Sequence, residues 1–169
     1  MAEGKNEEAR VSPTTAPTAR GRRVVVGADG SPRALRAVEW AAREAHWRAC
    51  PLVVVHATFW VGAFLHAPGN EAEAEREART LAEAVEHART TCPGLDVRGV
   101  AAEPPADQAL IDASGGAELL VVGSRGLGLV AEVVMGSVSL SCVKHAPCPV
   151  LVVRDGPGGR LDPSPTPGH

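Results

Sequence analysis

Five short apolar runs alternate along the chain with longer segments in which apolar residues recur every three or four positions. The runs are dominated by valine and leucine, a pattern typical of β-strands that are buried on both faces of a sheet. We predict these strands at Arg23–Ala28, Leu52–Thr58, Leu95–Ala101, Glu118–Val122 and Val150–Val153.

The segments between the runs predict amphipathic helices, because their apolar residues fall on one face at the helical period. We predict these helices from Pro32 to about Cys50 and at Glu71–Thr91, Pro104–Ser114 and Gly136–His145. Ser31 suits the N-cap of the first helix, and Pro32 suits its first position. In the longest helix, the stripe expected to face the sheet is Ala78, Leu81, Val85 and Ala88.

Strict alternation of strand and helix favours an α/β fold in which helices cover both faces of a parallel sheet through right-handed crossovers. In such folds, ligands bind at the carboxyl ends of the strands, where the strand order reverses. We expect one domain at residues 22–154. The segments 1–21 and 155–169 are rich in small residues, proline or glycine and are expected to be disordered tails.

Composition narrows the range of partners. Hydrophobic residues make up 44% of the chain and aromatic residues 3%, so the core must consist of Val, Leu and Ala. The net charge of -3 argues against nucleic acid as a partner, because no basic face is visible. No apolar run approaches the ~20 residues that span a bilayer, and residues 1–20 lack the apolar stretch of a signal peptide. We therefore expect a cytoplasmic protein without a membrane partner.

The four cysteines lie in or beside apolar segments and show no CxxC spacing: Cys50, Cys92, Cys142 and Cys148. This favours free structural thiols over a redox or metal role. Pairing of Cys142 with Cys148 stays open from the sequence.

A glycine-rich segment follows the fourth predicted strand and opens the last helix. It reads Gly123-Ser124-Arg125-Gly126, then nine residues, then Gly136-Ser137-Val138-Ser139. Glycine permits close backbone approach, and the free N–H groups at a helix start attract an anion. The hydroxyls of Ser137 and Ser139 and the guanidinium of Arg125 add donors for a phosphate. A glycine-rich turn without a ligand is the alternative.

Two other phosphate-binding motifs fit this chain worse. A Walker loop requires Lys after its second glycine, but Ser137 follows Gly136. The dinucleotide fingerprint requires GxGxxG directly after the first strand, where this chain has Asp29-Gly30-Ser31.

The spacing G-x2-G-x9-G-[ST] of Gly123, Gly126, Gly136 and Ser137 resembles the nucleotide-binding signature of universal stress proteins. The segments VVVGADGSP at 24–32, LVVVHA at 52–57 and HAPCPVLVVR at 145–154 are similar to that family's first strand, second strand and closing segment. The resemblance covers Arg23–Arg154. It implies a five-stranded parallel sheet of order 3-2-1-4-5, a Rossmann-like fold of the adenine nucleotide alpha-hydrolase type.

The resemblance also implies an adenine-nucleotide site at the point where the strand order reverses. Ala28 and Asp29 would lie against the adenosine, Ala57 would meet the adenine ring, and Val122 would line the same pocket. The residues implied to approach the ribose and the phosphates are Gly123, Arg125, Gly126, Gly136, Ser137, Val138 and Ser139.

The function implied is that of a stress-response or signalling protein that binds ATP, or ADP or AMP, with or without Mg²⁺. The resemblance also implies a homodimer through the last strand, Val150–Val153, because members of the family often dimerise through that strand. Such pairing would cover an apolar sheet edge, which is otherwise a pairing hazard. A slow ATPase or phosphotransferase is a second hypothesis, although the sequence shows no dedicated acid–base pair. A purely structural interaction protein that binds no nucleotide is a third.

Three further features have less specific interpretations. His56 ends a strand and is expected to be a hydrogen-bonded wall residue, since the sequence shows no carboxylate partner for it. Trp40 and Trp47 share a helix face and are expected to pack in the core or in an interface. The segment Phe59–Leu65 either folds back onto the domain or forms a flap over the adenine end or a partner surface.

Overall fold

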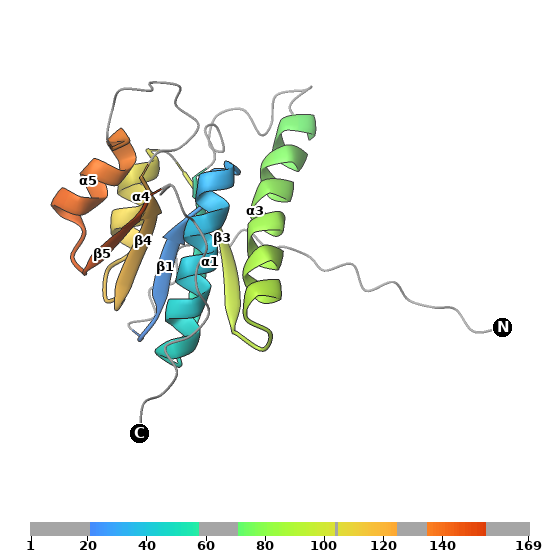
Figure 1. The fold of residues 1–169 in the computed structure, drawn as a ribbon. Helices are drawn as coiled ribbons and strands as arrows, with labels where there is room; N and C mark the ends of the chain where they lie inside the picture. Colours follow the sequence, from blue (N-terminus) through green and yellow to red (C-terminus); the bar gives the residue numbers. More distant parts are fainter. Residues whose placement is uncertain (1–20, 58–70, 104, 125–134, 155–169) are drawn as a thin grey trace.

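Five parallel strands form a single sheet at the centre of the molecule (Figure 1). The computed structural model describes residues 21–57, 71–103, 105–124 and 135–154. The strands are β1 (Val24–Gly27), β2 (Leu52–Ala57), β3 (Val97–Ala102), β4 (Leu119–Gly123) and β5 (Val150–Val153). Their order is β3-β2-β1-β4-β5 and every neighbouring pair is parallel, which confirms the expected fold.

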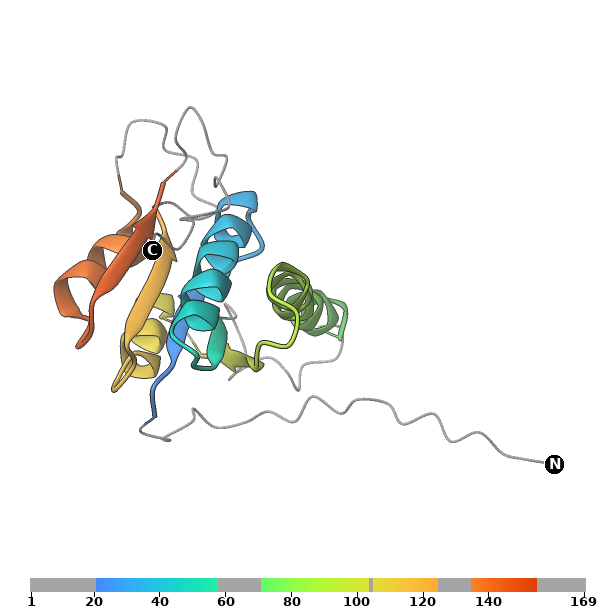
Figure 2. The ribbon, with the colours of Figure 1, turned by 60° about the horizontal axis from the view of Figure 1, so that its bottom comes forward.

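Two helices cover each face of the sheet in the described part of the chain. They are α1 (Pro32–Trp47), α3 (Glu71–Thr91), α4 (Ala106–Ala113) and α5 (Ser137–His145). Helices α1 and α3 pack on the face that carries Val24, Val26 and Val54, and Figure 2 shows α1 lying between α3 and β5. Helices α4 and α5 pack on the other face, where Leu110 and Cys142 meet the remaining strand side chains.

The central strands are apolar at every position because both of their faces are covered. Val24, Val25 and Val26 are each 0% exposed, so neighbouring residues of β1 belong to opposite cores. Alternate side chains of a strand point to opposite faces, which explains this division. The continuous valine run is therefore a consequence of a three-layer fold rather than of one-sided burial.

Helix α1 begins as the sequence predicts. The Ser31 hydroxyl accepts a hydrogen bond from the Ala34 N–H at 3.1 Å, and Pro32 occupies the first turn. This N-cap satisfies one of the free donors at the helix start. It also places the helix start directly after the carboxyl end of β1.

The predicted inner stripe of α3 is wrong at its first position. Ala78 is exposed, whereas Leu81, Ala84, Val85 and Ala88 are buried. The first buried residue of α3 is Leu81, and Gly99 of β3 leaves room for the Leu81 and Val85 side chains. Burial therefore begins one turn later than the periodicity indicates.

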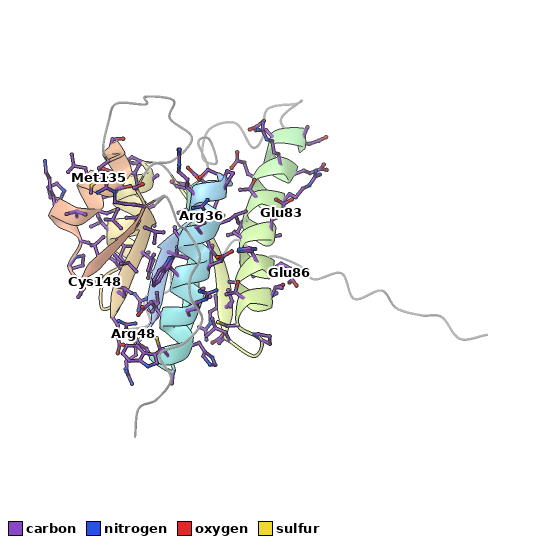
Figure 3. The ribbon with its side chains drawn as sticks, viewed as in Figure 1. Arg36, Arg48, Glu83, Glu86, Met135 and Cys148 are labelled. Carbon is purple, nitrogen blue, oxygen red and sulfur yellow. The ribbon has the colours of Figure 1, made fainter. Side chains whose placement is uncertain are left out.

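Of the two alternatives expected for the tryptophans, packing in the core is wrong. Trp47 is 80% exposed and Trp40 is 37% exposed, because they lie opposite the alanine-rich stripe that α1 buries. The Arg48 guanidinium, labelled in Figure 3 at the lower end of α1, lies 5.5 Å from the centre of the Trp47 ring. An interface role for the two tryptophans stays a prediction.

The structure tests the expectation about the cysteines, but several other expectations concern residues outside those it describes. All four cysteines are free thiols, and Cys50, Cys92 and Cys142 are buried. Among the described helices, none combines the length and the apolar character needed to cross a bilayer. The predicted tails, apart from the exposed Gly21, and the segment Phe59–Leu65 lie outside the described residues.

Candidate functional site

A pocket of about 110 Å³ opens at the carboxyl ends of β1 and β4, the two strands that flank the reversal of strand order. This is the upper edge of the sheet in Figure 1, where α1 and α5 begin. Seven of the sequence-predicted residues line the pocket: Ala28, Asp29, Ala57, Val122, Gly123, Val138 and Ser139. They come from four different elements or loops, so the fold brings together residues that are far apart in the chain.

Two of the other predicted residues form the start of α5. Gly136 is the N-cap of this helix, with φ −68° and ψ 157°, and Ser137 is its first residue. Met135, labelled in Figure 3, lies just before them at the same edge of the molecule. Arg125 and Gly126 lie outside the described residues.

The turn after β1 is held by its own polar side chains. The Asp29 carboxylate accepts a hydrogen bond from the Ser31 N–H at 3.0 Å. Gly30 adopts φ +79°, a conformation that favours glycine. Asp29 therefore has the local capping role expected of an Asp in this position, while it also lines the pocket.

The start of α5 presents main-chain donors beside the pocket. The Gly136 N–H donates to the Ser124 carbonyl at 2.7 Å, which ties the helix start to the end of β4. Gly136 has no side chain with which to cap the first turn. The N–H groups of that turn, together with the helix dipole, favour an anion at this point.

The Ser139 hydroxyl has a structural partner in this arrangement. It is buried and donates to the Gly123 carbonyl at 2.6 Å, which joins the first turn of α5 to β4. Its single hydrogen is engaged in this bond. The main-chain N–H groups and the exposed Ser137 hydroxyl are then the donors that the first turn of α5 offers to an anion.

Sequence reasoning missed the apolar wall of the pocket. This wall includes Gly27, Ala34, Val55, Ala106 and Leu110. A Cβ atom on Gly27 would lie 3.0 Å from a Leu110 methyl group, so Leu110 packs directly on the glycine backbone. Helix α4 carries no motif, and only the tertiary fold shows that Ala106 and Leu110 face the pocket.

The structure supplies a carboxylate partner for His56, which the sequence did not show. The His56 ring is 5% exposed, and its Nδ1 lies 2.7 Å from the Ala28 carbonyl oxygen. Its Nε2 contacts the Glu77 carboxylate of α3. The expectation that His56 is hydrogen-bonded is confirmed. His56 does not line the pocket, and its carboxylate partner is one that the sequence did not show.

Within residues 21–57, 71–103, 105–124 and 135–154, no group of three or more His, Cys, Asp or Glu side chains could hold a metal ion. At the other end of the sheet, Glu118 forms ion pairs with Arg22 and Arg48. Glu118 has a lowered pKa, chiefly because it accepts a hydrogen bond from Arg22.

A doubly wound parallel sheet with a pocket at its switch point defines a Rossmann-like α/β domain. The sequence profile of the universal stress protein family matches residues 21–154, and the chain belongs to this family. A universal stress protein of Mycolicibacterium smegmatis is 34% identical over 140 residues, which cover 78% of this chain and 47% of that protein. The chain thus spans about half the length of the curated mycobacterial relatives it matches.

Solved structures of the family share the fold. A universal stress protein in complex with cAMP is 28% identical, with a TM-score of 0.65, over 78% of this chain and 96% of that chain. The universal stress protein of Archaeoglobus fulgidus in complex with dAMP is 25% identical, with a TM-score of 0.62, over 79% of this chain and 98% of that chain.

Proposed function

We propose that this chain binds an adenine nucleotide, with ATP as the expected ligand, in the pocket at the ends of β1 and β4. The observation that carries the proposal is the assembly of seven predicted residues around that one pocket. Similar proteins in complex with cAMP and dAMP support the choice of an adenine base. The pocket lies where ligands bind in open α/β sheets.

Different parts of the pocket wall match the base, the ribose and the phosphates of an adenine nucleotide. Ala57, Val122 and Leu110 form an apolar surface against which a flat base can pack. The Asp29 carboxylate has oxygens that accept hydrogen bonds from ribose hydroxyls. The start of α5 at Gly136 offers the positive end of a helix dipole for the phosphates, with or without Mg²⁺. Arg125 of the glycine motif is the cation that the sequence adds.

In this proposal the domain is a nucleotide-dependent binding protein of the cytoplasm that acts in stress response or signalling. Nucleotide occupancy would change the surface at the carboxyl edge of the sheet, which includes the starts of α1 and α5. The proposed output is a change of protein partner rather than a chemical reaction.

We also propose that the protein forms a homodimer through β5. This strand is at one edge of the sheet, and all four of its residues are only half-buried. Leu140 and Val143 of the neighbouring helix α5 are 42% and 48% exposed. An apolar strand edge beside exposed aliphatic side chains is suited to association with a second copy.

Calorimetric titration with ATP, ADP, AMP and cAMP tests nucleotide binding. We expect the wild-type protein to bind at least one of them and Gly136→Val to weaken that binding by at least ~10-fold, equivalent to ~1.4 kcal/mol. A β-branched side chain at this N-cap would occupy the space in front of the first-turn N–H groups of α5. Gly21→Val is the matched control, since the Cβ position of Gly21 is open and lies at the opposite end of β1.

The outcomes separate two parts of the proposal. A wild-type protein that binds none of the four nucleotides would contradict the function itself. Normal binding by Gly136→Val would instead contradict the placement of the phosphates at α5. Equal loss in Gly136→Val and Gly21→Val would show a general effect of valine on the fold.

A further inference from the structure

Helix α5 has little apolar packing at its start. Of the nine described residues of this helix, Ser139 and Cys142 are the buried ones, and Val138 is half-buried against the same core. Cys142, which is 0% exposed, lies one turn beyond Ser139. Helix α1, by contrast, buries an alanine-rich stripe along its length and begins with a side-chain cap. The position of the first turn of α5 therefore depends largely on polar contacts.

Among the described residues, two hydrogen bonds join this first turn to the end of β4. The Gly136 N–H donates to the Ser124 carbonyl at 2.7 Å. The Ser139 hydroxyl donates to the Gly123 carbonyl at 2.6 Å. Gly136 is the N-cap and Ser139 lies three residues later, so the two bonds hold both ends of the turn. The first bond is formed by main-chain groups alone, whereas the second depends on one side-chain hydroxyl.

The anchored turn forms part of the pocket wall. Val138 and Ser139 line the pocket, and so do Val122 and Gly123 of β4. The N–H groups of the first helical turn have no acceptor within their own helix. They are the donors to which we assign the phosphates, whereas β4 lines the part of the pocket to which we assign the base. The seating of the first turn on β4 therefore sets where a phosphate lies relative to the base.

The Ser139 hydroxyl also affects the charge beside the pocket. The Gly123 carbonyl oxygen carries a partial negative charge and only accepts hydrogen bonds. The hydroxyl hydrogen of Ser139 lies against this oxygen. Without that hydrogen, the carbonyl would lose a donor in a buried place and would repel an anion at the start of α5. Anchoring of the turn and compensation of the carbonyl both favour a bound phosphate.

We propose that Ser139 is a positioning residue through which the pocket prefers a nucleotide to the corresponding nucleoside. This inference rests on the proposed nucleotide function. It differs from the direct phosphate contact that the family resemblance implies for Ser139, because the single hydrogen of this hydroxyl is engaged by Gly123. Ser139 acts on the phosphate through the main-chain donors that it holds in place.

Calorimetric affinities for AMP and adenosine test the proposal through their ratio. We expect the wild type to bind AMP more tightly than adenosine. Ser139→Ala should lower the AMP affinity by about 10-fold and the adenosine affinity by less than about 2-fold, because the hydrogen bond it removes supports the phosphate donors alone. Alanine is smaller than serine by one oxygen and is compatible with a helix, so the fold should be retained.

The same helix provides a matched control in Ser141. Its hydroxyl donates to the Asp107 carboxylate of α4 at 2.7 Å, and Ser141 does not line the pocket. Ser141→Ala therefore also removes one hydrogen bond between α5 and a neighbouring element. We expect it to leave the ratio of AMP to adenosine affinity unchanged, because the contact lies away from the first-turn donors.

Hydrogen exchange of the protein without nucleotide separates an anchor from a direct phosphate ligand. The Leu140 N–H donates to the Gly136 carbonyl at 2.9 Å, and the Gly136 N–H donates to Ser124. Exchange of these two amide protons reports opening of the first turn. Ser139→Ala should speed their exchange by about 5-fold, as expected for the loss of one anchoring hydrogen bond. Ser141→Ala should leave both rates near those of the wild type.

The outcomes separate a positioning role from a general structural role. Loss of stability alone lowers both affinities by the same factor, since both ligands bind only the folded chain. An unchanged ratio in Ser139→Ala, or an equal fall of the ratio in Ser141→Ala, would overturn the proposal. A lowered ratio with unchanged exchange would show a direct phosphate ligand and would also overturn it.

The wild type alone distinguishes this proposal from the proposed function. Equal affinities for AMP and adenosine would overturn the role of Ser139 but would leave adenine-nucleotide binding intact. A wild type that binds neither AMP nor any other adenine nucleotide would overturn the proposed function as well.

Discussion

Short polar side chains close the turn that leads from β1 into the pocket. The Asp29 carboxylate accepts from the Ser31 N–H, and the Ser31 hydroxyl accepts from the Ala34 N–H. These bonds satisfy main-chain donors at the start of α1 that would otherwise need water. The same few residues therefore end a strand, start a helix and present a carboxylate to the pocket.

Replacing Ser31 with alanine should lower the free energy of unfolding by about 1 kcal/mol, because the N-cap acceptor is lost. Urea denaturation of the two proteins measures this difference. Ser31→Asp keeps an acceptor at the same place and serves as the control. A Ser31→Ala protein as stable as both others would show that the cap contributes nothing in this turn.

The reactivity of a cysteine thiol depends on how deeply that residue is buried. Burial raises the pKa of Cys142 to about 11, with a smaller contribution from nearby Asp107. Only the thiolate reacts with alkylating agents, and at pH 8 a group with such a pKa is ionised in about one molecule per thousand.

We therefore expect Cys142 to resist iodoacetamide at pH 8 in the native protein and to react after denaturation. Cys148 is only half-buried and should react earlier. Mass spectrometry of timed samples identifies the modified cysteine, and Cys148→Ser removes the faster site. Equal labelling rates for Cys142 and Cys148 in the native state would contradict this prediction.

At the scale of elements, α4 and α5 are joined across the face of the sheet by one polar contact. The Ser141 hydroxyl donates to the Asp107 carboxylate at 2.7 Å. This bond is the main cause of the lowered pKa of Asp107. A carboxyl group whose pKa is lower in the folded state than in the unfolded state stabilises the fold above its unfolded value. That contribution is lost as the pH falls through the folded value.

Ser141→Ala should return the pKa of Asp107 toward its ordinary value of 3.8, which NMR titration of the side chain measures. The stability difference between wild type and Ser141→Ala should therefore shrink as the pH falls below about 4. In an Asp107→Asn background, Ser141→Ala should leave the acid dependence unchanged. A constant difference between pH 6 and pH 3 would argue that the hydroxyl acts only through packing.

Element positions could be predicted from the sequence wherever local patterns determine them. Short apolar runs rich in valine or leucine marked β1, β2, β4 and β5, a weaker apolar run marked β3, and Ser31-Pro32 marked the start of α1. The order of the strands came from the family resemblance, since no local pattern specifies which strands are neighbours. The predicted burial of α3 was wrong at Ala78, because burial along this helix depends on where it packs against β3.

The residues around the candidate site likewise fall into two groups: those that a local sequence pattern predicts and those that only the tertiary fold brings together. Gly123 and Gly136 were predictable because they belong to one spaced motif, and Asp29 because it directly follows a strand. Leu110 was not, because it lies on a helix without a motif and reaches the pocket only through tertiary packing. For the same reason, the sequence did not show that Glu77 is the partner of His56.

At the scale of the whole molecule, the proposed ligand and the proposed partner use different edges of the sheet. The pocket lies at the carboxyl ends of β1 and β4, and β5 forms one lateral edge. The outer face of α3 at the other side carries Glu83 and Glu86 (Figure 3). Because β4 contributes to the pocket and pairs with β5, the proposed nucleotide site and the proposed dimer contact would share one strand.

The hydrogen bonds of β5 indicate a variant that tests association. The carbonyls of Pro149 and Val153 accept from β4. In a parallel pair the residues that bond to the neighbouring strand alternate with those that face away, so the Val152 N–H faces the open edge. Proline at position 152 removes that donor without removing a bond to β4.

We expect light scattering at micromolar concentration to give a mass near twice the 17.5 kDa of one chain for the wild type. Val152→Pro should give a mass closer to one chain while its circular dichroism stays native. Ala101→Pro is the matched control, because Ala101 is exposed on the opposite edge strand and the same alternation turns its N–H away from β2. A monomeric wild type, or a Val152→Pro protein that stays dimeric, would show that β5 is not the contact between copies.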